Sequence, residues 1–482
     1  MKEKLIIIGS GLAGLAAALA AAEQGQSSVL VSELPPERSQ SVLAEGGING
    51  ELSGKTEDVL PYWADTVQAG AGLSDPNAVR GMVEAAPGIV RWLDELGTAF
   101  QRTPEGLALR RLGGHRKERT LFAGSSTGKA VITALADEAR KQETAGLIKR
   151  LDHHRFQNLI LQKTICMGCM VQDCYTEKQI CLYGPVLLAS GGMSGLFPGH
   201  ATGTLKNDGS AAAAVFSQGV EFGNLEFIQY HPTTVPVSGK NLLISEAARS
   251  EGGRLYIERN GVPWYFLEEL CGPEGNLVSR DLAVRKMYEV CSRPDCRPPV
   301  YLDMREIPEV AWQKRLEGIK EECGKFLNIN PEKTPVPIEP AVHYFMGGIL
   351  VDERHRANKN FLYAVGECAC QYHGANRLGG NSMLGALYGG KVAARTAVEE
   401  LGKYRAAACG FQEKRNTPRK VLNRRVKTGL TEEGWRRFCS AVWGLSEKKR
   451  SFRKRSVSLK KCGRGSIWLR KKETESCWLP QW

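Results

Sequence analysis

Five short clusters in the sequence combine residue types that bind anions and exchange protons. Guanidinium groups bind carboxylates through two parallel hydrogen bonds, and histidine and glutamate side chains can act as acids or bases. Each cluster alone has an ordinary explanation, such as a turn cap, a core histidine or an exposed helical ion pair. Their coincidence in one chain favours a site for a charged substrate. The clusters are His231-Pro232-Thr233-Thr234, Ser245-Glu246-Ala247-Ala248-Arg249, Ser279-Arg280-Asp281, His343-Tyr344-Phe345-Met346-Gly347-Gly348 and His373-Gly374-Ala375-Asn376-Arg377-Leu378-Gly379-Gly380-Asn381-Ser382.

The N-terminal thirty residues carry a different signal, an apolar strand that runs into a glycine-rich turn and an alanine-rich helix. The turn reads Gly9-Ser10-Gly11-Leu12-Ala13-Gly14. Its first glycine permits the tight turn, the second lets the backbone approach a pyrophosphate, and the third lets the helix lie close to the strand. A second strand at 29–31 ends at Ser32-Glu33, where an acidic group is expected to bind a ribose hydroxyl. This order predicts a dinucleotide-binding βαβ unit.

Composition limits the size and class of the protein. A chain of 482 residues is too long for one ordinary domain, so two or three are expected. The 14 cysteines are scattered, which favours reduced thiols over a disulfide framework. Cys166-Met167-Gly168-Cys169 has the spacing of a metal half-site, but its strand-like alternation favours ordinary cysteines, and no metal site is predicted. No apolar run approaches the ~20 residues of a membrane span. We therefore expect a cytoplasmic protein that reaches the inner face of a membrane only through a partner.

The positive charge of the chain is concentrated at its C-terminal end. The net charge is +13, and residues 411–482 hold 21 Lys and Arg against 6 Glu, so the preceding residues are nearly neutral together. A solvated basic extension is the simplest expectation. Docking to an acidic redox partner or an anionic membrane stays open, as does a disrupted reading frame, whereas nucleic acid is not the expected partner.

The segments between the motifs predict a nucleotide-binding domain that is interrupted by an insertion. Residues 58–96 show the periodicity of two helices, and Cys166 to Tyr183 alternate like a β-hairpin. A buried strand at 186–190 precedes two glycines, which would let it run beneath a cofactor. From about residue 226 to 340 the character changes to mixed helix and loop. A strand at 361–365 and a helix from about Ser382 to Leu401 return to the earlier style.

With these motifs, the sequence resembles the fumarate reductase and succinate dehydrogenase flavoprotein family, which also includes L-aspartate oxidase. The likeness runs from residue 4 to about 400, and the clusters that begin at His343 and His373 are the most specific to it. It implies an α/β fold with a Rossmann-like FAD-binding domain, an inserted α+β capping domain that closes over the flavin, and a basic C-terminal tail. The expected boundaries are 1–230 and 341–405 for the FAD-binding domain, 231–340 for the capping domain and 406–482 for the tail.

The resemblance also implies roles for individual residues. Arg280 resembles the family's proton-transferring arginine, and Glu246 and Arg249 resemble its relay to solvent. An arginine needs such a relay, because its pKa is normally above ~12. Glu45-Gly46-Gly47 would approach the isoalloxazine, and Glu367 would bind FAD hydroxyls. The substrate carboxylates would be held by His231, Ser245, His343 and Arg377. The complete set expected at FAD is Gly9, Gly11, Gly14, Ser32, Gln40, Ser41, Glu45, Gly46, Gly47, Asp208, Glu367, Asn381 and Ser382.

Departures from the family pattern bear on the cofactor and the substrate. Membrane-linked members attach FAD covalently to the histidine of a Ser-His-Thr sequence, whereas this chain has Ser39-Gln40-Ser41, which predicts non-covalent FAD. L-Aspartate oxidases usually carry a glutamate before Gly-Gly-His, where this chain has Leu112, and an apolar residue argues against an amino-acid substrate. The stretches 119–124 and 243–247 nevertheless look oxidase-like, so the assignment within the family stays open.

We therefore predict FAD-dependent interconversion of fumarate and succinate, in the reducing direction, by hydride transfer at flavin N5 with Arg280 as proton carrier. The predicted partners are a small dicarboxylate and an iron-sulfur or other redox subunit. L-Aspartate oxidase, which makes iminoaspartate for NAD biosynthesis, is the alternative within the family. A non-catalytic flavoprotein with a nucleic-acid- or membrane-binding tail is the alternative of another class. The presence of all five clusters speaks against that last alternative.

Overall fold

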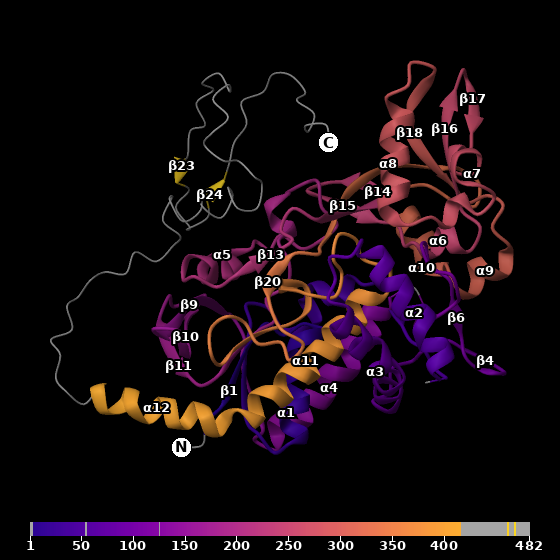
Figure 1. Ribbon diagram of the computed structural model, residues 1–482. Coiled ribbons are helices and arrows are strands. Elements are labelled where there is room, and N and C mark those ends of the chain that lie inside the picture. Colours follow the sequence, from indigo (N-terminus) through magenta and orange to yellow (C-terminus); the bar gives the residue numbers. More distant parts are fainter. Residues whose placement is uncertain (1–2, 54, 125, 416–459, 462–466, 469–482) are drawn as a thin grey trace.

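A five-stranded parallel sheet forms the centre of the protein (Figure 1). The structure is a computed structural model that describes residues 3–53, 55–124, 126–415, 460–461 and 467–468. The strand order is β21-β12-β1-β2-β8, and every pair in it is parallel. The bounds are β1 Leu5–Ile8, β2 Ser28–Val31, β8 Ile148–Leu151, β12 Val186–Leu188 and β21 Leu362–Ala364. Because β1 and β21 are more than 350 residues apart, the central sheet is formed from segments that are distant in the sequence, as expected for an interrupted nucleotide-binding unit.

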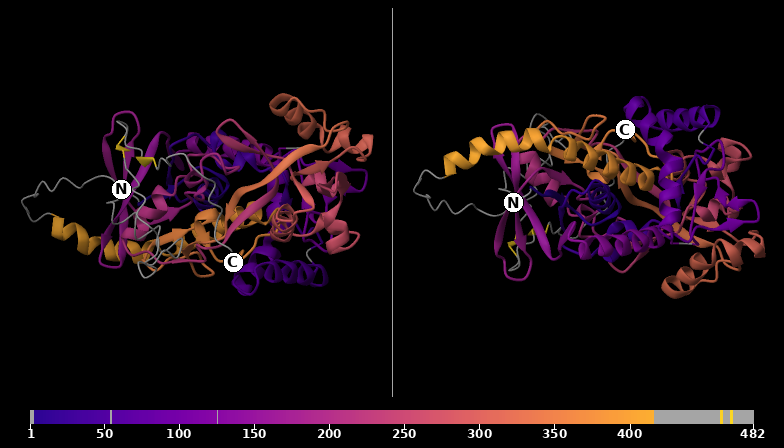
Figure 2. Two further views of the ribbon diagram at one scale, coloured as in Figure 1. Left: turned by 90° about the horizontal axis from the view of Figure 1, so that it is seen from above. Right: turned by 90° about the horizontal axis from the view of Figure 1, so that it is seen from below.

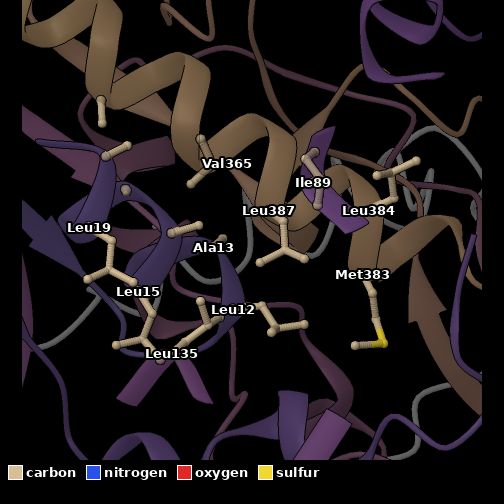
Figure 3. Packing of buried hydrophobic residues seen from close by; sticks show 14 of the residues in the cluster. Leu12, Ala13, Leu15, Leu19, Ile89, Leu135, Val365, Met383, Leu384 and Leu387 are labelled. Carbon is tan, nitrogen blue, oxygen red and sulfur yellow. The ribbon is translucent and has the colours of Figure 1, made fainter. Parts of the chain in front are cut away.

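Helix α1, Leu12–Glu23, is almost wholly buried and packs against α4 and α11 (Figure 3). Its alanines let neighbouring helices approach closely. A Cβ on Gly390 of α11 would lie 2.5 Å from the carbonyl oxygen of Ala13, so the close contact requires glycine there. Leu15 and Leu19 of α1 face this core. The burial is large, since each leucine contributes about 1.5–3 kcal/mol when removed from water.

The helices predicted from periodicity are present. The region expected to hold two helices contains α2 Thr56–Ala69 and α3 Pro76–Glu95. The helix expected from about Ser382 is α11, Asn381–Glu399. Helix α12, Leu401–Arg415, crosses the expected boundary at 406, so the predicted tail begins within a helix. Beyond Arg415 the predicted tail lies outside the described residues, except for the paired strands β23 Lys460–Lys461 and β24 Ile467–Trp468. The other helices of this part are α4 Thr127–Thr144 and α5 Ser210–Ser217.

A six-stranded antiparallel sheet forms the second large unit, in the order β15-β14-β19-β18-β16-β17. It lies at the opposite end of the molecule from the sheet β11-β10-β9 in both views of Figure 2. Residues 226–340 were expected to be mixed helix and loop, and the sheet corrects that expectation. Its own hydrophobic core includes Phe266, Leu302 and Trp312. The bounds are β14 Ile228–Val237, β15 Lys240–Leu243, β16 Arg254–Arg259, β17 Val262–Trp264, β18 Cys296–Asp303, β19 Val336–Phe345, α6 Ala247–Ser250, α7 Phe266–Cys271, α8 Arg280–Cys291, α9 Glu309–Lys314 and α10 Glu317–Glu322.

Smaller sheets and turns connect these two units. The predicted hairpin at 166–183 is present as β10 and β11. Cys166 and Cys169 of β10 are buried, and burial raises the pKa of both thiols. The described residues contain no group of three or more His, Cys, Asp or Glu arranged to hold a metal ion. The remaining bounds are β3 Ile48–Asn49, β4 Arg102–Thr103, β5 Gly106–Leu107, β6 Leu109–Arg110, β7 Thr120–Leu121, β9 His154–Gln162, β10 Ile165–Asp173, β11 Gln179–Tyr183, β13 Phe222–Gly223, β20 Gly348–Leu350 and β22 Ala369–Cys370, the 3₁₀ turns Pro36–Arg38, Gln40–Leu43, Ser194–Leu196, Gly275–Leu277 and Gly366–Cys368, and a π turn at Cys323–Leu327.

Among the helices that the structure describes, none combines the length and the apolar character needed to cross a lipid bilayer.

Candidate active site

A long cavity begins at the carboxyl ends of β1, β2, β12 and β21 and continues to the edge of the six-stranded sheet. Ligands of open parallel sheets usually bind at this edge, outside the carboxyl ends of the strands. At the far end, the cavity wall is formed by side chains of β14 and α8 and by the loop between β22 and α11. One cavity therefore joins the glycine-rich turn to the charged clusters.

The glycine-rich turn has the shape that a pyrophosphate requires. Gly9 has a φ of +110°, and a Cβ there would lie 2.2 Å from the carbonyl oxygen of Ala189. A Cβ on Gly14 would lie 1.8 Å from the carbonyl oxygen of Gly9, so the helix packs directly on the turn. Gly11 begins α1 without a capping side chain, and the amide of Leu12 donates to Ser41 Oγ over 3.1 Å. The helix N-terminus thus opens onto the cavity with its positive end.

Acidic and amide side chains follow the cavity away from the turn. Glu33, at the end of β2, lines the cavity while it accepts two hydrogen bonds from Arg155, over 2.8 and 2.9 Å. The Oε1 atom of Gln40 accepts a hydrogen bond from the amide of Thr204 over 2.6 Å, so this amide side chain is fixed in the cavity wall. An amide is not a nucleophile, so the Gln40 side chain cannot form a covalent bond to a flavin. Ser32 and Asp208 also line the cavity.

Glu367 marks the passage between the two ends of the cavity. Its carboxylate lies against Gly192, where a Cβ would come within 2.3 Å of Oε1, and it accepts from the amide of Phe345 over 3.1 Å. Burial raises the pKa of Glu367 to about 7, although the Phe345 amide and the Arg377 charge lower it in part. Burial also raises the pKa of Glu45, and Glu322 raises it further.

Asn381 does not contribute its side chain to the cavity, in contrast to the expectation. The side chain is fully buried, accepts from Tyr62 and Asn49 over 2.6 Å each, and donates to Thr66 over 3.1 Å. These bonds direct it into the packing between α2 and α11. Its neighbour Ser382 does line the cavity.

Glu246 is the centre of the charged end. Its side chain is 1% exposed, and each carboxylate oxygen has its own arginine. Oε1 accepts from Arg249 Nη2 over 2.7 Å, and Oε2 accepts from Arg280 Nη2 over 2.7 Å and Nε over 2.9 Å. Burial alone would raise the pKa of Glu246, but Arg280 and Arg249 lower it below its ordinary value. Arg249 lies behind Glu246 rather than in the cavity wall, and donates to the carbonyl of Asn276 over 2.9 Å.

Two arginines share one amide oxygen at this end. Gln229 Oε1 accepts from Arg280 Nη1 over 3.1 Å and from Arg377 Nη2 over 3.0 Å. Arg377 also donates to Ser382 over 2.9 Å and lies over the ring of Tyr344, with 4.3 Å between the guanidinium carbon and the ring centroid. Burial lowers the pKa of Arg377 to about 9, and the Arg280 charge contributes. The Nε of Arg377 is buried and has no hydrogen-bond partner among the described residues, so it can donate to an anionic ligand.

Two histidines face each other beside these arginines. The rings of His231 and His343 have centroids 5.0 Å apart. Burial lowers the pKa of both, and the Arg280 charge lowers it further, so both rings are neutral near pH 7. His231 Nδ1 lies 3.3 Å from the amide nitrogen of Thr233 and 3.2 Å from its Oγ1, so this ring nitrogen faces the protein. Thr202 is hydrogen-bonded to His343 Nδ1 over 2.8 Å.

Two glycines enclose the carboxylate of Glu246. A Cβ on Gly113 would lie 2.6 Å from Oε1, and one on Gly379 would lie 2.8 Å from Oε2. Leu112 is fully buried and packs behind Gly379. A Cβ on Gly379 would lie 2.9 Å from Cδ1 of Leu112. Leu112 does not line the cavity, although its apolar side chain was taken to argue against an amino-acid substrate.

The structure brings together residues from all five clusters in the cavity wall, and Gln229 is the main residue that sequence reasoning missed. A signal for it existed, because residues two apart on a strand share a face and Gln229 precedes His231 by two. Within the predicted set, Gly14, Arg249 and the Asn381 side chain lie outside the cavity wall. The predicted residues that line it are Gly9, Gly11, Ser32, Gln40, Ser41, Glu45, Gly46, Gly47, Asp208, His231, Ser245, Glu246, Arg280, His343, Glu367, Arg377 and Ser382.

Comparison with known proteins decides the family. Residues 4–383 match the model of an FAD binding domain. The succinate dehydrogenase flavoprotein subunit of Bacillus subtilis is 42% identical over 417 residues, which cover 84% of this chain and 71% of that protein. This chain belongs to the fumarate reductase and succinate dehydrogenase flavoprotein family. It is therefore an FAD-dependent oxidoreductase.

Other members of the family agree in sequence and in fold. An L-aspartate oxidase of a Nostoc strain is 34% identical and covers 79% of this chain and 65% of that protein. A mutant E. coli quinol fumarate reductase has 29% identity and a TM-score of 0.78, and the match covers 86% of this chain and 74% of that chain. The family resemblance stated from the motifs is thus confirmed, and the residues expected at FAD that line the cavity fit the cofactor of the family.

Proposed function

We propose that this flavoprotein interconverts fumarate and succinate. The observation that carries the proposal is the buried charge balance at the far end of the cavity. Arg249, Arg280 and Arg377 contribute three positive charges and Glu246 one negative charge, while His231 and His343 are neutral near pH 7. The resulting charge of +2 complements a dicarboxylate dianion in a region that excludes water. Buried charge without such a partner is costly, so a dianion would be held strongly.

The orientation of the substrate would come from both sides of the cavity. Arg377 offers a planar guanidinium with a free buried Nε to one carboxylate. His231 would hydrogen-bond a carboxylate through Nε2, with His343 and Ser245 beside it. FAD, when bound along the glycine-rich turn and Glu367, supplies hydride exchange with one substrate carbon.

Arg280 would supply or accept the proton at the neighbouring carbon. Its guanidinium is bound by Glu246 through two hydrogen bonds, so a proton lost to the substrate can be replaced through the ionised carboxylate, which would first take up a proton from Arg249. Glu246 in turn is bound by Arg249 at the edge of this region. The three groups form one hydrogen-bonded row that leads away from the cavity, which supports the relay proposed from the resemblance.

L-Aspartate oxidation is the second candidate, because L-aspartate oxidases are among the relatives of this chain. An aspartate carries an ammonium group that needs an acidic partner. Both oxygens of Glu246 are already bound by arginines. The geometry therefore favours a dicarboxylate without an amino group.

The proposed assembly includes a redox partner. The B. subtilis relative is named as a subunit, and one structural neighbour is a quinol-fumarate reductase with menaquinol molecules. We propose that this chain exchanges electrons with a partner subunit and lies at the inner face of a membrane through it. Residues 231–340 would act as the capping domain of the substrate site.

The test compares three substrates on the purified flavoprotein. Anaerobic flavin reduction by succinate and by L-aspartate is followed at about 450 nm, and reoxidation of the reduced flavin is followed after addition of fumarate. We expect rapid reoxidation by fumarate and faster reduction by succinate than by L-aspartate. Faster reduction by L-aspartate, with fumarate a poor oxidant, would assign the protein to the oxidases. No response to any of the three would remove the enzymatic proposal.

A further inference from the structure

The two arginines of the proposed substrate site belong to different parts of the fold, yet their neighbours in the sequence are bonded to each other. Arg280 begins α8, and Arg377 lies in the loop before α11. Asn376 Nδ2 donates to Asp281 Oδ1 over 2.7 Å. Asp281, which follows Arg280, is thus hydrogen-bonded to Asn376, which precedes Arg377.

Gln229 completes a closed ring with this pair. Its Nε2 donates to Asn376 Oδ1 over 2.8 Å, and its Oε1 accepts from both arginines. The amide of Asn376 therefore has an acceptor on one side and a donor on the other. Oδ1 of Asn376 accepts a hydrogen bond and Nδ2 donates one, and this fixes the orientation of the amide.

Asp281 is itself held in place from the side of α8. The same Oδ1 accepts from Ser279 Oγ over 2.5 Å, and Oδ2 accepts from Arg285 Nη2 over 2.5 Å. Asp281 also lies in the first turn of α8, where a negative charge is favourable. The acceptor offered to Asn376 is therefore rigid, although the pair is partly open to solvent.

The ring has a physical task, because two buried guanidinium groups repel each other. Arg280 and Arg377 share one neutral oxygen of Gln229, and the only carboxylate that contacts either of them among the described residues is Glu246, on Arg280. A neutral oxygen compensates little of that repulsion in a region of low dielectric constant. A mechanical link between the two backbones would keep the arginines at a fixed separation.

We propose that Asn376 and Asp281 form a clasp that sets the spacing between the carboxylate-binding Arg377 and the proton-carrying Arg280. The two residues are positioning residues, since neither lines the cavity. This inference rests on the proposed function of the two arginines. It adds that the Asn376–Asp281 hydrogen bond forms only when the six-stranded-sheet unit is closed onto the loop before α11.

An exchange of the two side-chain types tests the clasp. Asn376→Asp keeps the acceptor for Gln229 but places a carboxylate against the Asp281 carboxylate, so the clasp should open. We expect kcat/KM for fumarate to fall by about 10- to 100-fold, with KM raised, because misplacement by about 1 Å can cost 100-fold. The double variant Asn376→Asp with Asp281→Asn restores a donor opposite a carboxylate and should recover most of the loss. The matched control is Asn260→Asp, the same substitution at an exposed turn.

Binding of malonate, a dicarboxylate that does not react, gives a second readout without turnover. Titration calorimetry on the FAD-loaded variants should rank malonate affinity in the same order as kcat/KM. Asp281→Ala, which removes the acceptor without introducing repulsion, should weaken malonate binding by about 10-fold.

Two results would overturn the clasp. One is near-normal turnover and malonate affinity in Asn376→Asp or in Asp281→Ala. The other is a double variant no better than Asn376→Asp, which would show that the loss does not come from the pair. If the unmodified protein turns over neither fumarate nor succinate, the proposed function fails, whereas the malonate ranking still decides the clasp.

Discussion

Glu246→Gln is the substitution for which the structure predicts the largest loss of stability with the smallest change of shape. The side chain is 1% exposed and forms ion pairs of 2.7 Å with both Arg249 and Arg280. The amide keeps the volume but removes the charge, which leaves both guanidiniums buried without a counter-ion. Removing one partner of a buried ion pair costs about 3–5 kcal/mol, and here two pairs lose the same partner. We expect the unfolding free energy to fall by at least the lower value.

Glu84→Gln is the matched control. Glu84 also pairs with an arginine over 2.7 Å, but Arg80 and Glu84 are 60% and 50% exposed on one face of α3. Such a surface pair is worth about 0.5 kcal/mol or less. Urea unfolding of the two FAD-loaded variants, followed by circular dichroism at a fixed excess of FAD, gives both midpoints. Equal midpoints for the two variants would refute the view that Glu246 neutralises a buried cation cluster.

The effect of low pH on the stability difference between the unmodified protein and Glu246→Gln has a defined direction. The pKa of Glu246 is lowered from its ordinary value of 4.5 by Arg280 and Arg249, against the opposing effect of burial. Its contribution to stability is therefore complete above about pH 4.5 and is lost as the pH falls through the lowered pKa. The gap between the unmodified protein and Glu246→Gln should be full at pH 7 and narrow only below pH 4.5. A gap that narrows between pH 6 and pH 7 would contradict the assignment.

Three further predictions concern the cofactor and the proton. Because Gln40 offers no nucleophile, acid denaturation should release all flavin into the supernatant, and flavin in the precipitate would contradict this. Arg280→Ala should lower turnover at least ~100-fold while FAD stays bound, as measured by flavin absorbance and dye-linked fumarate reduction; near-normal turnover would move the acid role elsewhere. Burial raises the pKa of Glu367 to about 7, so the folded apoprotein should lose stability as the pH rises from 4.5 to 7, and Glu367→Gln should remove that slope in urea titrations. An unchanged slope in the variant would show that another group titrates there.

The cofactor end of the site could be predicted because its signals are local. Gly9, Gly11 and Gly14 act through the turn that they form, and the turn is complete within ten residues. The direction of the Asn381 side chain could not be predicted, for the opposite reason. The direction of its side chain depends on Tyr62 and Asn49, which are more than 300 positions away in the sequence.

The antiparallel sheet was hidden by prolines in its strands. β14 contains Pro232, and its pairing with β19 shifts register between His231 and Thr234. β18 contains Pro298 and Pro299, and its pairing with β16 shifts around them. Proline removes a ladder hydrogen bond and is accommodated at such irregularities, so the periodic pattern of a strand is lost in the sequence. Gln229 was missed for a different reason, because it joins two arginines that only the folded chain brings together.

The two glycines that enclose Glu246 have a consequence for how this protein would tolerate variation. Gly113 and Gly379 come from distant parts of the chain, and neither needs to touch a substrate to be irreplaceable. Even alanine at either position would push a methyl group into the carboxylate, which its two arginines hold in place. In a library randomised at every position, these two glycines should therefore be as intolerant as the charged residues themselves. A map of tolerated substitutions would therefore show intolerant positions on both sides of the Glu246 carboxylate, although Gly113 and Gly379 have no reactive side chain.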